Sequence, residues 1–132
     1  MSAPADPVPT APSGEIVIRT IAMPAVANSN GDIFGGWLVA QMDLGGAILA
    51  RSTALSRVTT VAIDGMSFLN PVGVGDTVSC YAQLLNIGHT SMKISVEAWV
   101  HHFITSTQQR VTAGIFTYVA IDPDGKPHPV KR

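Results

Sequence analysis

The sequence predicts an α+β fold, in which an antiparallel sheet of about five strands wraps around one long apolar helix. Residues 33–50 carry a single charge, Asp43, within an apolar run of helical length. After Arg57 the pattern changes to short runs rich in β-branched residues, separated by turn residues. Only 13% of the residues are charged, against about 25% in an average domain. Such a chain must bury much of its surface, and a homo-oligomer would supply part of that burial.

The N-terminal half is expected to hold one strand, one loop and the helix. Glu15–Ala22 (EIVIRTIA) is short and rich in β-branched residues, which favours a strand. Met23–Ile33 follows with a proline, two asparagines and a glycine, which are typical of a loop. The pair Gly35 and Gly36 then opens the helix.

The helix is predicted to present its one carboxylate on a side made of small residues. At about 100° per residue, Asp43 lies together with Val39 and Ala47, so other backbone can approach closely there. The remaining sides are apolar, and the helix is expected to be buried nearly all round. The run approaches the length of a membrane span, but its central carboxylate and four glycines favour a buried helix without membrane contact.

The C-terminal half predicts four strands that pair in antiparallel order. The run that begins at Ser91 alternates apolar and polar side chains, which is the pattern of a half-buried strand. The segment Gly88-His89-Thr90 joins it to the preceding strand as a short hairpin. The predicted strands are Val58–Leu69, Asp76–Ile87, Ser91–Phe103 and Arg110–Ile121. We therefore expect a disordered N-terminal tail at 1–14, one folded domain at 15–122 and a C-terminal tail at 123–132.

Composition excludes several classes of protein. The chain has 132 residues and a net charge of −1, and its eight Lys and Arg are scattered, so it lacks the basic footprint of a nucleic-acid-binding protein. Cys80 is the only cysteine, which excludes an internal disulfide and fits a reducing compartment such as the cytoplasm. His101 and His102 are neighbours in a predicted strand and face opposite ways, so we expect no metal site.

Asp43 is the strongest candidate for a functional residue. A carboxylate in an apolar run costs stability unless a partner solvates it or a reaction uses it. Burial also raises the pKa of a carboxyl group, which suits a general base or a nucleophile. The alternative is a structural carboxylate that caps a neighbouring turn, because buried carboxylates are seldom without a partner.

Several segments resemble one enzyme family. The stretch NSNGDIFGGW from Asn28 to Trp37, followed by Gln41 and Asp43, resembles the signature of hotdog-fold acyl-CoA thioesterases of the YciA-like branch. The similarity extends over residues 19–122, nearly the whole expected domain. Further matching segments are Arg57–Ala62, Met66–Phe68, Pro71–Asp76 and Gly88–Ser91.

The resemblance implies a fold, an activity and a set of catalytic residues. In that family the sheet wraps the helix, two protomers pair their sheets edge to edge, and the thioester lies at their interface. It implies that Asp43 is the catalytic carboxylate and that Asn28 is a catalytic asparagine of the opposite protomer. The Gly36 N–H, with that of Gly35, is expected to polarise the thioester carbonyl, since a helix N-terminus offers free donors. No metal or cofactor is expected, because CoA is part of the substrate.

The resemblance also implies a CoA site and an assembly. The hairpin residues Gly88, His89, Thr90 and Ser91 are expected near bound CoA, where free N–H groups and hydroxyls could hold a phosphate. Arg57 is expected to reach a CoA phosphate. A dimer, and from it a hexamer made of three dimers, is the expected assembly.

Each of these assignments has an alternative. Asn28 is also a common turn residue, the glycine pairs could serve close packing, the hairpin could be a plain turn, and Arg57 could be a surface arginine. The rival functions are a non-catalytic acyl-CoA binding module on the same fold, a hydratase that uses a histidine with a carboxylate, and a purely structural oligomer. The acyl chain length stays open, although Met42, Met66 and Phe68 could limit it.

Overall fold

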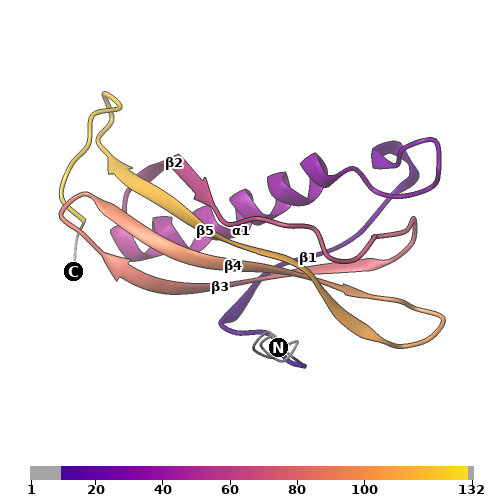
Figure 1. The fold of residues 1–132 in the computed structure, drawn as a ribbon. Coiled ribbons are helices and arrows are strands. Elements are labelled where there is room, and N and C mark those ends of the chain that lie inside the picture. Colours follow the sequence, from indigo (N-terminus) through magenta and orange to yellow (C-terminus); the bar gives the residue numbers. More distant parts are fainter. Residues whose placement is uncertain (1–9, 131–132) are drawn as a thin grey trace, which may run out of the picture.

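The fold consists of one sheet with one long helix lying across it (Figure 1). A computed structural model describes residues 10–130. Residues 1–9 of the predicted N-terminal tail lie outside the described part of the chain. In chain order the elements are β1 (Glu15–Ile21), η1 (Pro24–Val26), α1 (Gly35–Ala54), β2 (Arg57–Asp64), β3 (Thr77–Ile87), β4 (Ser91–His101) and β5 (Gln108–Ile121).

The sheet has five antiparallel strands in the order β1-β3-β4-β5-β2. The helix connects the two edge strands, β1 and β2, and therefore crosses the sheet from one side to the other (Figure 1). It contacts all five strands, which confirms the predicted α+β fold with a sheet wrapped on one helix.

The helix buries one side only, so the prediction of nearly complete burial is wrong. The buried side has small residues at its centre, Gly45, Gly46 and Ala50, which let the strands approach closely. On the other side the side chains of Leu44 and Ile48 are 58% and 49% exposed. Apolar periodicity alone could not separate a helix side that meets the sheet from one that meets another surface.

The predicted glycine packing is confirmed at the middle of the helix. A Cβ added at Gly45 would lie 2.6 Å from Cγ2 of Val17 on β1, and one at Gly46 would lie 2.9 Å from Cζ of Tyr118 on β5. Real Cβ atoms do not sit so close to other atoms, so both positions need glycine for close approach. The helix ends at Ala54. The N–H of the next residue, Leu55, still donates to the Arg51 carbonyl at 2.8 Å, and the left-handed φ of 54° at Leu55 turns the chain out of the helix.

The strand after the helix is shorter than predicted. The expected strand Val58–Leu69 ends at Asp64, because Gly65 adopts a positive φ of 74° and turns the chain. Beyond it, the Leu69 N–H donates to the Val111 carbonyl at 2.9 Å, so the segment still runs beside β5. The other three predicted strands of this half agree with β3, β4 and β5 to within two residues at each end.

The described part of the predicted C-terminal tail folds back on the sheet. The His128 N–H donates to the Ala120 carbonyl at 3.0 Å, and the Val130 N–H donates to the His89 carbonyl at 2.9 Å. Val130 itself is buried in the core. Within residues 10–130, no helix combines the length and the apolar character that crossing a membrane requires.

Candidate active site

Asp43 lies near the middle of α1, half-buried against the sheet. Its Oδ1 accepts a hydrogen bond from the Thr60 hydroxyl at 2.6 Å and lies 3.1 Å from the Tyr118 hydroxyl. The same Tyr118 hydroxyl lies 2.9 Å from the backbone carbonyl oxygen of Asp43. Both donors are side-chain hydroxyls from strands rather than backbone N–H groups of a turn, so the carboxylate does not cap a turn.

The register of the sheet brings these two donors together. Thr60 on β2 and Tyr118 on β5 are direct partners across the strand pair. Side chains of paired residues point to the same face of a sheet, and this face meets the helix at Asp43. Burial, followed by the charge and the hydrogen bond of Asp43, raises the pKa of Tyr118. Its phenol therefore stays protonated near neutral pH and remains a donor.

The helix N-terminus offers two backbone donors. Phe34, the residue before the helix, has extended backbone and gives no side-chain cap. For the N–H groups of Gly35 and Gly36 the structure provides no acceptor within residues 10–130. A Cβ at Gly36 would meet nothing within 4 Å, whereas one at Gly35 would lie 3.3 Å from the Phe68 ring. The Gly36 end is thus open to a ligand, and the Phe68 ring flanks it.

Asn28 is held by its own loop. Its Oδ1 accepts the backbone N–H of Asn30 at 2.9 Å and that of Asp32 at 3.2 Å. Its own N–H donates to the Asp32 carbonyl at 2.7 Å. Asn28 therefore does serve as a turn residue, which was the alternative to a catalytic role. Its Nδ2 is the part of the side chain that makes no hydrogen bond within the described residues.

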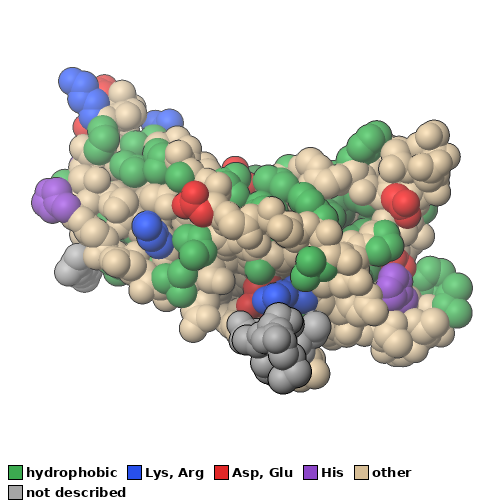
Figure 2. Space-filling model, viewed as in Figure 1, with side chains coloured by type: hydrophobic (Ala, Val, Ile, Leu, Met, Phe, Trp, Pro, Cys, Tyr) green, Lys and Arg blue, Asp and Glu red, His purple; other side chains and the backbone are tan. Residues whose placement is uncertain are grey.

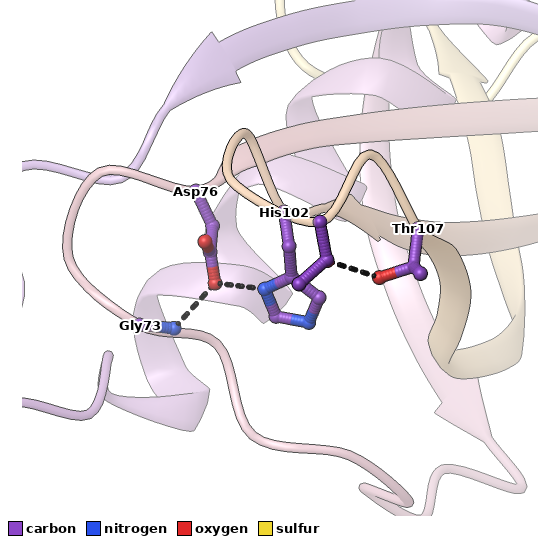
Figure 3. Close-up of polar contacts among 5 residues, drawn as sticks. Gly73, Asp76, His102 and Thr107 are labelled. Atoms are coloured by element: carbon purple, nitrogen blue, oxygen red, sulfur yellow. Dashed lines mark hydrogen bonds and ion pairs between the residues drawn. The ribbon is translucent and has the colours of Figure 1, made fainter.

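The Asn28 loop is fastened to the end of the sheet through a carboxylate–histidine pair (Figure 3). Asp32 of the loop forms an isolated antiparallel β-bridge with Gly73. The Gly73 N–H in turn donates to Oδ2 of the buried Asp76 at 2.9 Å. Nδ1 of His102 lies 3.0 Å from the same oxygen (Figure 3). This pair could not be predicted from the sequence, because Asp76 and His102 are distant in the chain and only the sheet brings them together.

A hollow with two arginines lies where α1 ends and β2 begins. Its volume is about 530 Å³, and Arg51, Ser52, Ser56 and Arg57 supply its polar lining. Arg57 was predicted to contact a phosphate of CoA, whereas no role was predicted for Arg51, which lines the same hollow. The Arg57 guanidinium also donates to the Pro123 carbonyl at 3.4 Å, a long bond that leaves most of its donors unused.

The hairpin Gly88–Ser91 lies at the same end of the sheet as this hollow. In the register, Arg57 opposes Ile121 and Ser91 opposes Val119. The Gly88 N–H donates to the Ser91 carbonyl at 2.8 Å, so this N–H is not free, and that part of the prediction is wrong. The carbonyls of His89 and Thr90 accept backbone N–H groups from Val130 and Ala120, each at 2.9 Å. The side chains of His89, Thr90 and Ser91 remain as the polar groups of the hairpin.

Cys80 does not take part in this site. It is buried on β3, and burial raises the pKa of its thiol to about 12. The thiolate, which is the nucleophilic form, is therefore scarce near neutral pH. Within residues 10–130 no group of three or more His, Cys, Asp or Glu side chains is placed to hold a metal ion.

Comparison with known proteins identifies the family. A family model described as the thioesterase superfamily matches residues 30–102. The acyl-CoA thioester hydrolase YciA of Salmonella typhimurium is 54% identical over 122 residues, which cover 90% of this chain and 92% of the relative. The chain belongs to the thioesterase superfamily.

Solved structures of the superfamily share the fold. The hexameric thioesterase of Yersinia pestis matches with a TM-score of 0.89 and 52% identity, over 92% of this chain and 100% of that one. A hexameric hotdog fold thioesterase of Campylobacter jejuni matches with a TM-score of 0.84 and 39% identity, over 89% of this chain and 91% of that one. The predicted hotdog fold is confirmed.

Within this thioesterase fold, the predicted residues fall into three groups. Gly35, Gly36 and Asp43 share one helix, with Asp43 about 10 Å along the axis from Gly36. Arg57 and the hairpin lie at the far end of that helix. Asn28 precedes the helix, and within residues 10–130 no hydrogen bond joins its side chain to Asp43.

Thr60 and Tyr118 were not among the residues predicted for the site. The alternation of buried and exposed positions along its strand could have identified Tyr118, because Tyr118 occupies an inward position between the buried Phe116 and Ala120. A hydroxyl at such a position needs a polar partner. Which partner the hydroxyl finds depends on the register of β2 against β5, and that register cannot be predicted from the sequence.

Proposed function

We propose that this protein is an acyl-CoA thioester hydrolase, which converts an acyl-CoA to a carboxylic acid and CoA. The observation that carries the proposal is a carboxylate, Asp43, held by two hydroxyls on a helix whose N-terminal N–H groups are open. The similarity over nine-tenths of the chain to an acyl-CoA thioester hydrolase supports the substrate.

Asp43 acts on the thioester carbonyl, either by deprotonating a water molecule or by direct attack. Water then supplies the oxygen of the acid product, the C–S bond breaks, and the thiol of CoA leaves with a proton. General-base catalysis contributes about 10²- to 10⁴-fold to such reactions. The alternative covalent route uses the same carboxylate, and the buried Cys80 thiol is a poor competitor as a nucleophile.

The N–H groups of Gly36 and Gly35 stabilise the negative charge that develops on the carbonyl oxygen. The absence of side chains at both positions allows an ester carbonyl to approach the helix N-terminus, where the dipole also favours negative charge. The Phe68 ring covers Gly35 and is 49% exposed, so it is suited to contact the acyl group. Met42 is fully buried in the core between the helix and the sheet, where it would limit how deep an acyl chain can reach.

The second catalytic residue, Asn28, comes from the opposite protomer of a dimer. β2 is an edge strand, and edge strands offer unpaired backbone groups to a second sheet. Figure 2 shows apolar side chains over α1 and β2. The exposed apolar residues of α1, β2 and the segment that follows β2 are Leu44, Ile48, Val61, Ile63, Phe68 and Leu69. A monomer would leave them in water, whereas an edge-to-edge dimer covers them and adds a loop from the partner to the site.

The hollow at Arg51 and Arg57 binds phosphates of CoA. Two guanidinium groups and the hydroxyls of Ser52 and Ser56 match the donors that phosphate oxygens need. The hairpin residues His89, Thr90 and Ser91 lie at the same end of the sheet and complete the CoA site. The hexameric relatives support an assembly of three such dimers. We place the protein in the cytoplasm, where a single unpaired cysteine is normal.

Thiol release from acyl-CoAs of increasing chain length tests this function. We expect turnover in the unsubstituted protein, a loss of about 1,000-fold in Asp43→Asn, and no change when EDTA is added. Glu15→Gln is the matched control, because Glu15 is an exposed carboxylate at the start of β1, the edge strand on the other side of the sheet. Acyl-CoA binding without thiol release would instead identify a binding module. Addition of water to an enoyl-CoA, lost in His102→Gln, would identify a hydratase.

A further inference from the structure

Tyr118 contacts the carboxylate of Asp43 and the backbone of the helix that carries it. Its side chain is fully buried, yet its hydroxyl reaches two oxygens of Asp43, the backbone carbonyl at 2.9 Å and Oδ1 at 3.1 Å. The first contact ties the hydroxyl to the helix backbone, and the second ties it to the carboxylate. The one hydroxyl hydrogen is shared between these two acceptors, and the hydroxyl therefore links the carboxylate to the backbone of its own helix and restricts its rotation.

The carboxylate is held at one oxygen only. Thr60 and Tyr118 both meet Oδ1, and no residue of the described range 10–130 donates to Oδ2. The two oxygens of Asp43 therefore differ, since one is bound by the protein and the other is available. A general base or nucleophile needs this arrangement, because its reacting atom must be free while its orientation is fixed.

Gly46 is what allows Tyr118 to reach this position. Glycine in a helix interior destabilises the helix relative to alanine, and Gly46 shows no positive φ that would require it. A Cβ at position 46 would lie 2.9 Å from Cζ of Tyr118 and still closer to its hydroxyl oxygen. Any side chain at 46 would therefore push the hydroxyl away from Asp43.

We propose that Tyr118, admitted by Gly46, is a positioning residue for thioester hydrolysis, which holds Asp43 through Oδ1 and leaves Oδ2 as the reacting oxygen. This inference rests on the proposed function. It assigns the reacting atom, and it gives Gly46 a role beyond helix packing. Misplacement of a catalytic group by about 1 Å costs on the order of 100-fold in rate, so loss of the hydroxyl should reduce kcat far more than KM.

Tyr118→Phe tests the inference most simply. The substitution keeps the ring, which stacks on Phe116 with centroids 6.3 Å apart, and removes only the hydroxyl. We expect kcat to fall about 10- to 100-fold with KM unchanged and the melting temperature close to that of the unsubstituted protein. Tyr81→Phe is the control, because Tyr81 lies on the face of the sheet away from the helix and should leave kcat unaltered.

A pair of glycine variants separates positioning from stability. Gly46→Ala strains the helix against Tyr118, whereas Gly45→Ala strains it against Val17. Both should lower the melting temperature, but only Gly46→Ala should lower kcat as Tyr118→Phe does. The double variant Gly46→Ala/Tyr118→Phe should be more stable than Gly46→Ala alone, because the clashing oxygen is gone, without any recovery of kcat.

Two results would overturn the inference. One is a kcat for Tyr118→Phe within twofold of the unsubstituted protein, and the other is an equal kcat loss in Gly45→Ala and Gly46→Ala. Absence of thiol release from the unsubstituted protein is a separate result. It would overturn the proposed function, and this inference with it.

Discussion

Asp43 and Asn28, the two proposed catalytic side chains, are held in opposite ways. Asp43 is fixed by Thr60 and Tyr118, which come from two different strands of the sheet. Asn28 is fixed by backbone N–H groups two and four residues further along its own loop. The setting of Asp43 thus depends on the packed core, whereas the setting of Asn28 depends on a short surface turn. We infer that core substitutions disturb the carboxylate and that loop substitutions disturb the asparagine.

Substitution of Asn28 should give the largest effect among tests of the loop. Asn28→Asp keeps the Oδ1 acceptor for Asn30 and Asp32 and therefore keeps the turn, but it removes the Nδ2 donor. We expect both Asn28→Asp and Asn28→Ala to lower kcat about 100-fold, which steady-state thiol release would measure. Asn30→Ala is the control, since Asn30 contributes its backbone N–H to the turn. Full activity in Asn28→Asp would reduce Asn28 to a turn residue.

The arginine hollow should affect binding and not turnover. It lies at the end of α1, away from both catalytic side chains. Arg57→Ala and Arg51→Ala should each raise KM for acyl-CoA about tenfold with kcat unchanged, because each removes charge-assisted bonds to phosphate. KM should also rise with salt in the unsubstituted protein. Lys93→Ala on the opposite face of the sheet serves as control, and an equal KM change there would contradict a specific phosphate site.

The anchor of the Asn28 loop should affect stability more than chemistry. Asp76→Ala leaves the Gly73 N–H and the His102 ring without their shared acceptor. We expect a decrease of about 2 kcal/mol in the free energy of unfolding, measured in urea, and a smaller loss of kcat than in Asn28→Ala. Asp76→Asn keeps an acceptor for Gly73 and should recover most of the stability. A kcat loss as large as that of Asn28→Ala would give Asp76 a direct role.

Cys80 offers a probe that distinguishes the two regions without an activity assay. It belongs to the same buried cluster as Met42 and Tyr118, and burial raises its pKa to about 12. At pH 8 the folded thiol should therefore react very slowly with a disulfide reagent, and faster only as pH approaches that value or the core opens. Asn28→Ala should leave this rate unchanged, whereas Gly45→Ala should raise it. Faster labelling in Asn28→Ala would show that the loop and the core are coupled.

The difference between the local contacts of Asn28 and the non-local contacts of Asp43 explains which features could be predicted from the sequence. The Asn28 loop and the helix start are encoded locally, by turn residues and a glycine pair, and both lie where the sequence predicts them. The partners of Asp43 are not local, because Thr60 and Tyr118 meet it only through the register of β2 and β5. The exposure of Leu44 and Ile48 could not be predicted either. A helix surface that binds a second subunit has the same apolar pattern in the sequence as a helix surface that packs in the core.

In the proposed dimer, each active site combines Asp43 of one protomer with Asn28 of its partner. Co-assembly of Asp43→Asn chains with Asn28→Ala chains tests this shared site, because a mixed dimer then holds one site with both residues intact and one with neither. Random pairing at equal amounts should restore about one quarter of the unsubstituted turnover per chain, although each variant alone is nearly inactive. Turnover no higher than the average of the two variants would contradict the shared site.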